Sequence, residues 1–204
     1  MTKKELILHE AKKMFAKRGY SATIMDDLAK VAGVNKATIY YHYKDKASLY
    51  ETLFLEGVKK IADETIEKSS IPKEPHEKLR EYIKAYAKRL KKCRYLTSIL
   101  LRELASGGES MPKSVLEQLF RTTKRLTNII EECTHISHTI CQEPMLIQLL
   151  IVSTLSAFIT TEPIRKRVKE EIDFSANTLP SLSIEEVADK LAFMITKNLQ
   201  GEKI

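Results

Sequence analysis

Residues 23–49 constrain the fold of this chain most, because their spacing prescribes two short helices joined by a tight turn. Ala29 is a small residue on the first helix, Gly33 stands where the turn needs a positive φ, and Ile39 is an apolar anchor on the second helix. Such spacing lets two helices cross closely and steeply. Asn35 follows the turn and can cap the second helix with its side chain. The stretch therefore predicts a helix-turn-helix.

The second of these helices is too polar and too aromatic to be buried. Its side chains include a cation, hydroxyl groups and an imidazole, supplied by Lys36, Thr38, Tyr40, Tyr41 and His42. A short helix that presents such groups suits insertion into the major groove of DNA. The charge distribution agrees, because residues 1–50 hold ten Lys and Arg against five Asp and Glu, whereas the rest of the chain holds 24 against 22. Phosphate binding requires such a basic excess, although a membrane surface would also attract it.

Another helix is expected before this motif. Apolar residues recur at helical spacing over residues 3–18, and Gly19 is expected to end that helix. Ser21 and Thr23 are capping candidates for the next helix, and we interpret Asp26 and Asp27 as the start of that helix, not as a catalytic dyad. The expected core of this three-helix headpiece comprises Phe15, Ile24, Leu28, Ala32, Val34, Ile39 and Tyr43.

The remaining residues also show helical spacing, so the sequence predicts an all-α fold. From Asp45, a possible cap, a helix is expected to run to the vicinity of Lys68 and to link the headpiece to the rest of the chain. Beyond it, no segment shows the alternation of a β-strand. The further helices are expected near residues 76–92, 95–106, 112–133, 144–161, 163–172 and 183–199.

One of these helices, 144–161, is apolar on nearly every side and therefore has to be covered on all sides. In a chain of this size, a second subunit is expected to cover part of it. The last helix, 183–199, carries a second apolar stripe, formed by Val187, Ala188, Leu191, Ala192, Ile195 and Leu199. Two such helices from each protomer would form a four-helix interface with two-fold symmetry. The sequence therefore predicts a homodimer.

Several functional classes lack support in the sequence. The three cysteines form no Cys-x-x-Cys pair and are odd in number, which favours a reducing compartment over a disulfide framework. The N-terminus has no signal-peptide core, and the most apolar run, residues 145–159, is too short and too polar for a membrane span. We therefore expect a cytoplasmic protein. No phosphate loop, GxGxxG, GxSxG or HExxH motif occurs, so we expect neither an enzyme nor a bound cofactor or metal.

The strongest competing chemistry is a group of potential soft metal ligands at Cys133, His135, His138 and Cys141. His135 and His138 share a helical face, so a zinc or copper site is chemically conceivable. Oxidation of Cys133 or Cys141 would be a second way to sense a signal. The spacing matches no standard zinc motif, however, and structural thiols with surface histidines are the simpler interpretation.

Residues 5–55 resemble the N-terminal DNA-binding domain of the TetR-type (TetR/AcrR) transcriptional regulators. The resemblance covers the whole headpiece in the stretch ILHEAKKMFAKRGYSATIMDDLAKVAGVNKATIYYHYKDKASLYETL. This chain departs from the usual pattern at Ala37, where members commonly carry Gly, and at Tyr43, where Phe is usual. The resemblance implies a DNA-binding domain over residues 1–46 and a helical ligand-binding and dimerisation domain over residues 47–204.

The resemblance also implies roles for individual residues. Thr23 would contact a phosphate at the start of its helix. Lys36, Ala37 and Tyr41 would face base edges, with Lys36 reaching guanine and Ala37 touching a thymine methyl. The remaining implied contacts to the DNA backbone come from Thr38, Tyr40, His42 and Lys46. Tyr40 could instead lie in the core, and His42 could instead be a solvent-facing residue with no role. Tyr43 is expected in the core.

A homodimeric, ligand-released repressor that reads a palindromic operator is thus the function that the resemblance implies. A small-molecule inducer would bind within the helical body and favour a conformation that holds the headpieces at the wrong separation. The candidate ligand contacts, each equally interpretable as core, are Tyr82, Tyr86, Leu100, Glu103, Phe120, Thr123 and Phe158. A helical protein that binds nucleic acid without sequence preference remains the alternative outside this class, beside the metal or thiol sensor.

Overall fold

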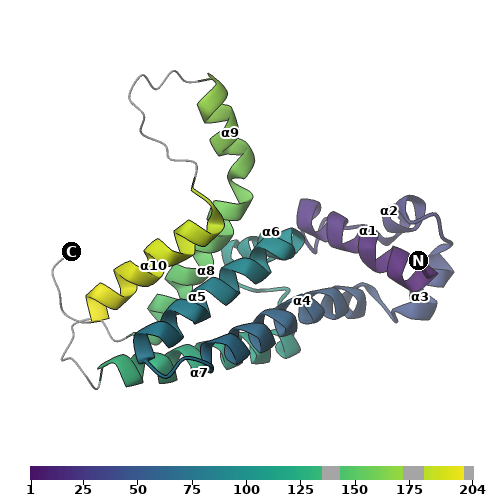
Figure 1. Cartoon of the computed structure of the whole chain (residues 1–204). Coiled ribbons are helices and arrows are strands. Elements are labelled where there is room, and N and C mark those ends of the chain that lie inside the picture. Colours follow the sequence, from purple (N-terminus) through teal and green to yellow (C-terminus); the bar gives the residue numbers. More distant parts are fainter. Residues whose placement is uncertain (135–142, 172–181, 200–204) are drawn as a thin grey trace. The chain divides into compact units, whose positions relative to one another are not determined.

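All regular structure in the described part of the chain is α-helical, which confirms the predicted all-α class (Figure 1). The structure is a computed structural model that describes residues 1–134, 143–171 and 182–199. The helices are α1 (Lys3–Arg18), α2 (Met25–Val31), α3 (Lys36–His42), α4 (Lys46–Ser69), α5 (Pro75–Lys92), α6 (Arg94–Ala105), α7 (Lys113–Thr134), α8 (Pro144–Thr160), α9 (Glu162–Glu171) and α10 (Ile184–Leu199).

These helices form two compact units. Unit 1 comprises residues 1–59 and 95–118, and unit 2 comprises residues 60–94 and 119–204. Helix α4 contributes its first part to unit 1 and its second part to unit 2. The predicted boundary after residue 46 divides a DNA-binding domain from a ligand-binding and dimerisation domain. The two structural units do not test this functional division, which stays a prediction.

Local side-chain chemistry sets the ends of the helices in unit 1. The Thr2 hydroxyl and the Glu5 carboxylate form a reciprocal capping box at the start of α1. Gly33 between α2 and α3 has φ of +60°, which confirms the conformation expected of the turn. The amide of Ala37 donates to the Asn35 side chain at 2.9 Å, so the predicted cap of α3 is confirmed.

The core of the headpiece follows the prediction at most positions. Phe15, Leu28 and Ile39 are fully buried where α1, α2 and α3 meet. Ile24 was expected in this core, but its side chain is 55% exposed. The reason is its position, because Ile24 is the N-cap residue of α2, and the inward-facing positions of that helix begin at Met25. Ile24 provides no side-chain cap.

Two residues of helix α6, Arg102 and Glu103, bind other parts of unit 1. The Arg102 guanidinium donates to the carbonyl oxygens of Ala16 and Lys17, at 3.2 Å and 2.7 Å, and thereby pairs two carbonyls at the open end of α1. One residue further on, Glu103 accepts a hydrogen bond of 2.6 Å from the Tyr50 hydroxyl of α4, with both side chains buried. Helix α6 is thus tied to the same unit as the helix-turn-helix.

In unit 2, α10 packs against α5 and α8 of its own protomer. The apolar stripe predicted to form a subunit interface is used here instead, because Ala188, Leu191, Ala192 and Ile195 are buried in these contacts. Apolar surface nevertheless remains uncovered on both helices, at Met145, Leu146, Leu149 and Leu150 of α8 and at Phe193 and Met194 of α10. This set is called the α8/α10 face below.

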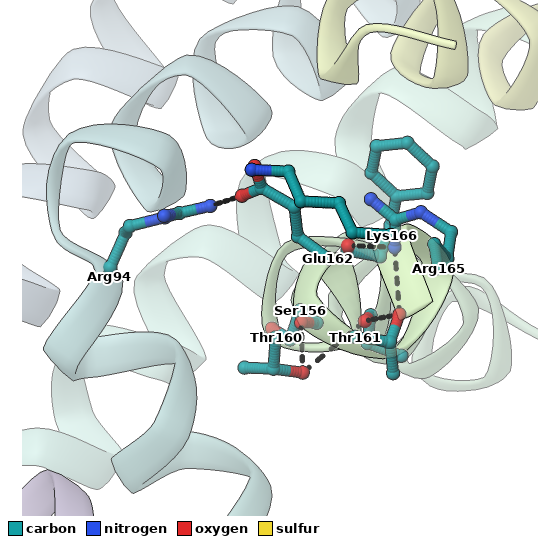
Figure 2. A network of polar contacts seen from close by, with 9 residues as sticks. Arg94, Ser156, Thr160, Thr161, Glu162, Arg165 and Lys166 are labelled. Atoms are coloured by element: carbon teal, nitrogen blue, oxygen red, sulfur yellow. Dashed lines mark hydrogen bonds and ion pairs between the residues drawn. The ribbon is translucent and has the colours of Figure 1, made fainter. Parts of the chain in front are cut away.

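Helix α8 ends at Thr160, and α9 leaves it at a bend of 53° (Figure 1). Figure 2 shows the polar contacts at this bend, where the Glu162 carboxylate pairs with Arg94 and Lys166. The Arg165 guanidinium donates to the Thr161 hydroxyl at 2.8 Å. These contacts hold the end of α8 and the start of α9. Within the described residues, no single helix has the length and apolarity of a membrane span, and only α8 and α9 taken together across the bend reach them.

Candidate nucleic-acid interface

Helix α3 presents four of the eight predicted DNA contacts to solvent. Lys36, Ala37, Tyr40 and Tyr41 are exposed, and the Tyr41 side chain reaches 85% exposure, which is unusual for an aromatic residue. Ile39, on the opposite face, is fully buried and holds the helix to the headpiece. The helix therefore offers a cation, a methyl group and two phenols on one accessible surface, as base and phosphate contacts require.

Lys36 has a partner inside the protein that the sequence pattern does not indicate. Its ammonium lies 2.8 Å from the Asp26 carboxylate of α2, and both side chains are exposed. The hydrogen bond with Asp26 raises the pKa of Lys36, so the ammonium stays charged. Lys36, which is predicted to bind guanine, is thus held at the protein surface by Asp26.

Two of the predicted phosphate contacts are engaged within unit 1. The Lys46 ammonium donates to the carbonyl oxygen of Ser21 at 3.1 Å and lies 4.5 Å from the centre of the Tyr20 ring. Thr23 is buried, and its hydroxyl donates to the carbonyl oxygen of Gly19 at 2.7 Å. The expected capping role of Thr23 is wrong, because Ile24 occupies the N-cap position of α2. Its assignment as a phosphate contact stays a prediction.

The remaining candidates at the end of α3 divide between surface and core. Thr38 and His42 are half-buried, and the rings of Tyr41 and His42 meet edge to face with centroids 5.1 Å apart. Tyr43 is buried, as expected, and its hydroxyl donates to the Lys4 carbonyl oxygen at 3.3 Å. Tyr40 is 42% exposed and therefore lies outside the core.

The predicted ligand contacts are divided between the two units. Leu100 and Glu103 belong to unit 1, whereas Tyr82, Tyr86, Phe120, Thr123 and Phe158 belong to unit 2. Phe120 is 66% exposed on α7. Phe158 is half-buried, and the Arg165 guanidinium lies 3.8 Å from the centre of its ring. Tyr82 and Tyr86 are fully buried and stack with centroids 6.2 Å apart.

The two buried tyrosines of α5 differ in hydrogen bonding. Tyr82 donates to the buried amide oxygen of Gln148 at 2.6 Å, and the carbonyl oxygen of Thr122 lies 3.1 Å from the same hydroxyl. The Tyr86 hydroxyl has no hydrogen-bond partner among the described residues, nor do the buried hydroxyls of Thr65 and Ser156 in the same unit. Burial raises the pKa of Tyr86 far above its ordinary value, so its phenol stays protonated. Unit 2 thus contains buried hydroxyls able to bond an additional group.

Of the four potential metal ligands, only Cys133 belongs to the described residues. His135, His138 and Cys141 lie outside them. Cys133 is buried on α7, and burial raises the pKa of its thiol to about 11. A thiol with such a pKa is almost wholly protonated near neutral pH and is a poor nucleophile. Cys133 therefore lacks the properties of a reactive sensor cysteine.

Residues 7–53 match a known domain family, described as bacterial regulatory proteins of the tetR family. The chain is 36% identical over 123 residues to the uncharacterised HTH-type transcriptional regulator YhgD of Bacillus subtilis, over 59% of this chain and 62% of YhgD. It is 42% identical over 48 residues to IcaR of Staphylococcus aureus, described as a negative transcriptional regulator of the biofilm operon icaADBC, over 24% of this chain and 26% of IcaR. Each match thus spans less than two thirds of the relative's length.

The fold extends the similarity beyond the headpiece. The structure of FadR from Bacillus subtilis, determined in complex with stearoyl-CoA, aligns with 95% of this chain and 98% of FadR at a TM-score of 0.69. The sequences are only 19% identical, so this likeness concerns the fold alone. The matched headpiece and the fold agree with each other: residues 7–53 match the tetR family of bacterial regulatory proteins, and the chain shares the fold of FadR.

Proposed function

We propose that the protein is a sequence-specific DNA-binding transcriptional regulator of the cytoplasm, which represses from a palindromic operator as a homodimer and is released by a small-molecule ligand. The observation that carries this proposal is the exposed surface of α3 within a headpiece that matches the tetR family. The description of the relative IcaR as a negative regulator supports repression. Two headpieces would enter successive major grooves about 34 Å apart.

The proposed base contact and the proposed backbone contact predict different binding defects. Replacing Lys36 with alanine should lower discrimination at one base pair of the operator by about 10-fold or more, because the lost contact reads a base edge. Replacing Lys46 with alanine should weaken binding to every duplex by a similar factor, because a phosphate carries no sequence information. Anisotropy titrations of the operator and of its single-base variants measure both effects. An unchanged discrimination at every base pair in the Lys36 variant, with only a uniform loss of affinity, would contradict the assignment of Lys36 to a base.

A homodimer would account for the apolar surface that unit 2 leaves uncovered. Six large apolar side chains remain exposed on α8 and α10, two helices in contact, whereas single exposed apolar residues would need no such explanation. A second copy of the chain is the occupant that fits a palindrome, since a two-fold axis relates both the half-sites and the subunits. Dimerisation through this face would place one headpiece on each half-site.

The ligand would bind within unit 2, where three buried hydroxyls have no partner among the described residues. An unpaired buried hydroxyl costs stability, and a ligand with hydrogen-bonding groups would recover that cost on binding. Helix α4 contributes residues to both units, and Thr65 is among those of unit 2. FadR, which shares the fold, was crystallised with stearoyl-CoA, so acyl-CoA thioesters are a rational first set of compounds to test.

Phenylalanine substitutions at Tyr86 and at Tyr82, one helical turn away, test whether the Tyr86 hydroxyl is unpaired. Replacing Tyr86 with phenylalanine should leave the free energy of unfolding unchanged or raise it by up to about 1 kcal/mol, because no hydrogen bond is lost. The matched change at Tyr82 should lower it by about 1–2 kcal/mol, because its hydroxyl has the Gln148 side chain as a partner. Urea unfolding of both variants gives the comparison. Equal destabilisation would show that Tyr86 has a protein partner and is not held for a ligand.

A further inference from the structure

The proposed DNA-binding surface contains an exposed carboxylate, that of Asp26. Asp26 lies in the first turn of α2, exposed, with its oxygen 2.8 Å from the ammonium of Lys36 at the start of α3. A carboxylate beside the recognition helix opposes binding to any duplex, because DNA presents a dense row of negative phosphates. The Asp26 carboxylate also offsets the positive charge of Lys36, which is predicted to reach the bases.

The second acidic residue of α2 differs in its surroundings. Asp27 follows Asp26 directly, but its carboxylate lies 2.6 Å from the guanidinium of Arg18 at the end of α1. That ion pair joins α1 to α2 and involves no residue of α3. The two neighbouring aspartates therefore hold different cations, and only Asp26 holds one of the predicted DNA-reading side chains.

We propose that Asp26 is a specificity-determining residue, which directs Lys36 toward its base and penalises duplexes that lack that base. The inference rests on the proposed function, because it requires that the surface of α3 binds DNA. An ammonium has three donor hydrogens, so Lys36 can keep its bond to Asp26 while it donates to the O6 and N7 atoms of a guanine. On a matching site the carboxylate fixes the direction of the lysine.

On a duplex without the matching base, the same carboxylate acts against binding. Lys36 then stays paired with Asp26, and the pair contributes no net charge toward the phosphates. Water is displaced as DNA approaches, which strengthens the repulsion between Asp26 and nearby phosphates. The operator offsets this repulsion through the base contact, whereas a non-specific duplex does not. Asp26 thus widens the gap between the two affinities mainly by weakening the unwanted one.

The test compares the wild type with Asp26→Asn and Asp27→Asn on two duplexes, a palindrome selected by the wild type and its scrambled control. Anisotropy titrations over a range of salt give affinities and salt slopes. For Asp26→Asn we expect binding to the scrambled duplex to strengthen about tenfold near 0.1 M salt, with a salt slope steeper by about 0.9, since Lys36 becomes free to reach a phosphate. Discrimination between the duplexes should fall about tenfold. Asp27→Asn should change both affinities by the same factor and keep the discrimination.

A double variant shows whether the effect acts through Lys36. If it does, Asp26→Asn should change the discrimination little when Lys36→Ala is already present. Equal behaviour of the two single variants, or an undiminished effect in the double variant, would overturn the role of Asp26. A wild type that does not discriminate between the duplexes would overturn the proposed function itself and this inference with it. Thermal melting confirms that each variant is folded.

Discussion

Replacing Leu150 with aspartate is expected to convert the protein to monomers that bind the operator about 10²-fold more weakly than the wild type, or weaker still. Leu150 lies on the α8/α10 face and is 47% exposed within the protomer. In the proposed dimer this side chain is covered by the second copy, so a carboxylate there would be buried without a partner. A monomer places one headpiece on DNA at a time and loses the gain from simultaneous binding of both half-sites.

Sedimentation equilibrium measures the oligomeric state of the variant, and operator titration measures its affinity for DNA. Leu116→Asp is the matched control, since Leu116 is 51% exposed on α7 and lies outside the α8/α10 face. It introduces the same charge at a leucine of similar exposure and should leave the protein dimeric. A Leu150→Asp protein that remains a dimer with unchanged operator affinity would place the subunit interface elsewhere.

Replacing Tyr50 with phenylalanine should lower the free energy of unfolding by about 2 kcal/mol, because it leaves a buried carboxylate without its donor. The Tyr50 hydroxyl donates to Glu103 at 2.6 Å, and the second carboxylate oxygen of Glu103 is buried without a partner among the described residues. Burial, together with the bond to Glu103, raises the pKa of Tyr50 far above its ordinary value, so the phenol remains a donor. This bond links α4 to α6 within unit 1.

Urea unfolding tests the Tyr50 prediction against two further variants. Tyr41→Phe removes a hydroxyl from a side chain that is 85% exposed and should leave stability within about 0.5 kcal/mol of the wild type. Adding Glu103→Leu to Tyr50→Phe should restore much of the lost stability, since replacing both polar partners by apolar groups removes the unpaired charge. Destabilisation by Tyr50→Phe that the second substitution does not relieve would contradict the buried-pair account.

Features of the headpiece that depend on neighbouring residues could be predicted from the sequence. The positive φ of Gly33 and the caps at Asn35 and Asp45 each involve groups at most three residues apart. Their geometry therefore follows from the spacing of residues that are close in sequence. The helix limits were predictable for the same reason, because they follow from periodicity and from breaks at glycine and proline.

Contacts between distant residues could not be predicted in this way. Tyr50 and Glu103 are 53 positions apart, and Tyr82 and Gln148 are 66 apart, so no spacing rule connects them. Asp26 was interpreted as a residue that favours a helix start, which its position allows. Its pairing with Lys36 depends on how α2 and α3 cross. The apolar stripe of α10 shows the same limit, since periodicity identifies a buried face but not whether the cover comes from the same protomer.

Binding of the wild-type protein to unbiased DNA decides whether the headpiece reads DNA sequence as part of a symmetric dimer. Bound sites are selected from a random duplex library, and the selected site and a scrambled control are titrated by anisotropy at several salt concentrations. We expect a palindrome that is bound more tightly than the control by a factor of about 10³ or more. Equal binding of both duplexes with a steep salt slope would contradict it, because a basic headpiece that contacts phosphates alone would then explain the binding.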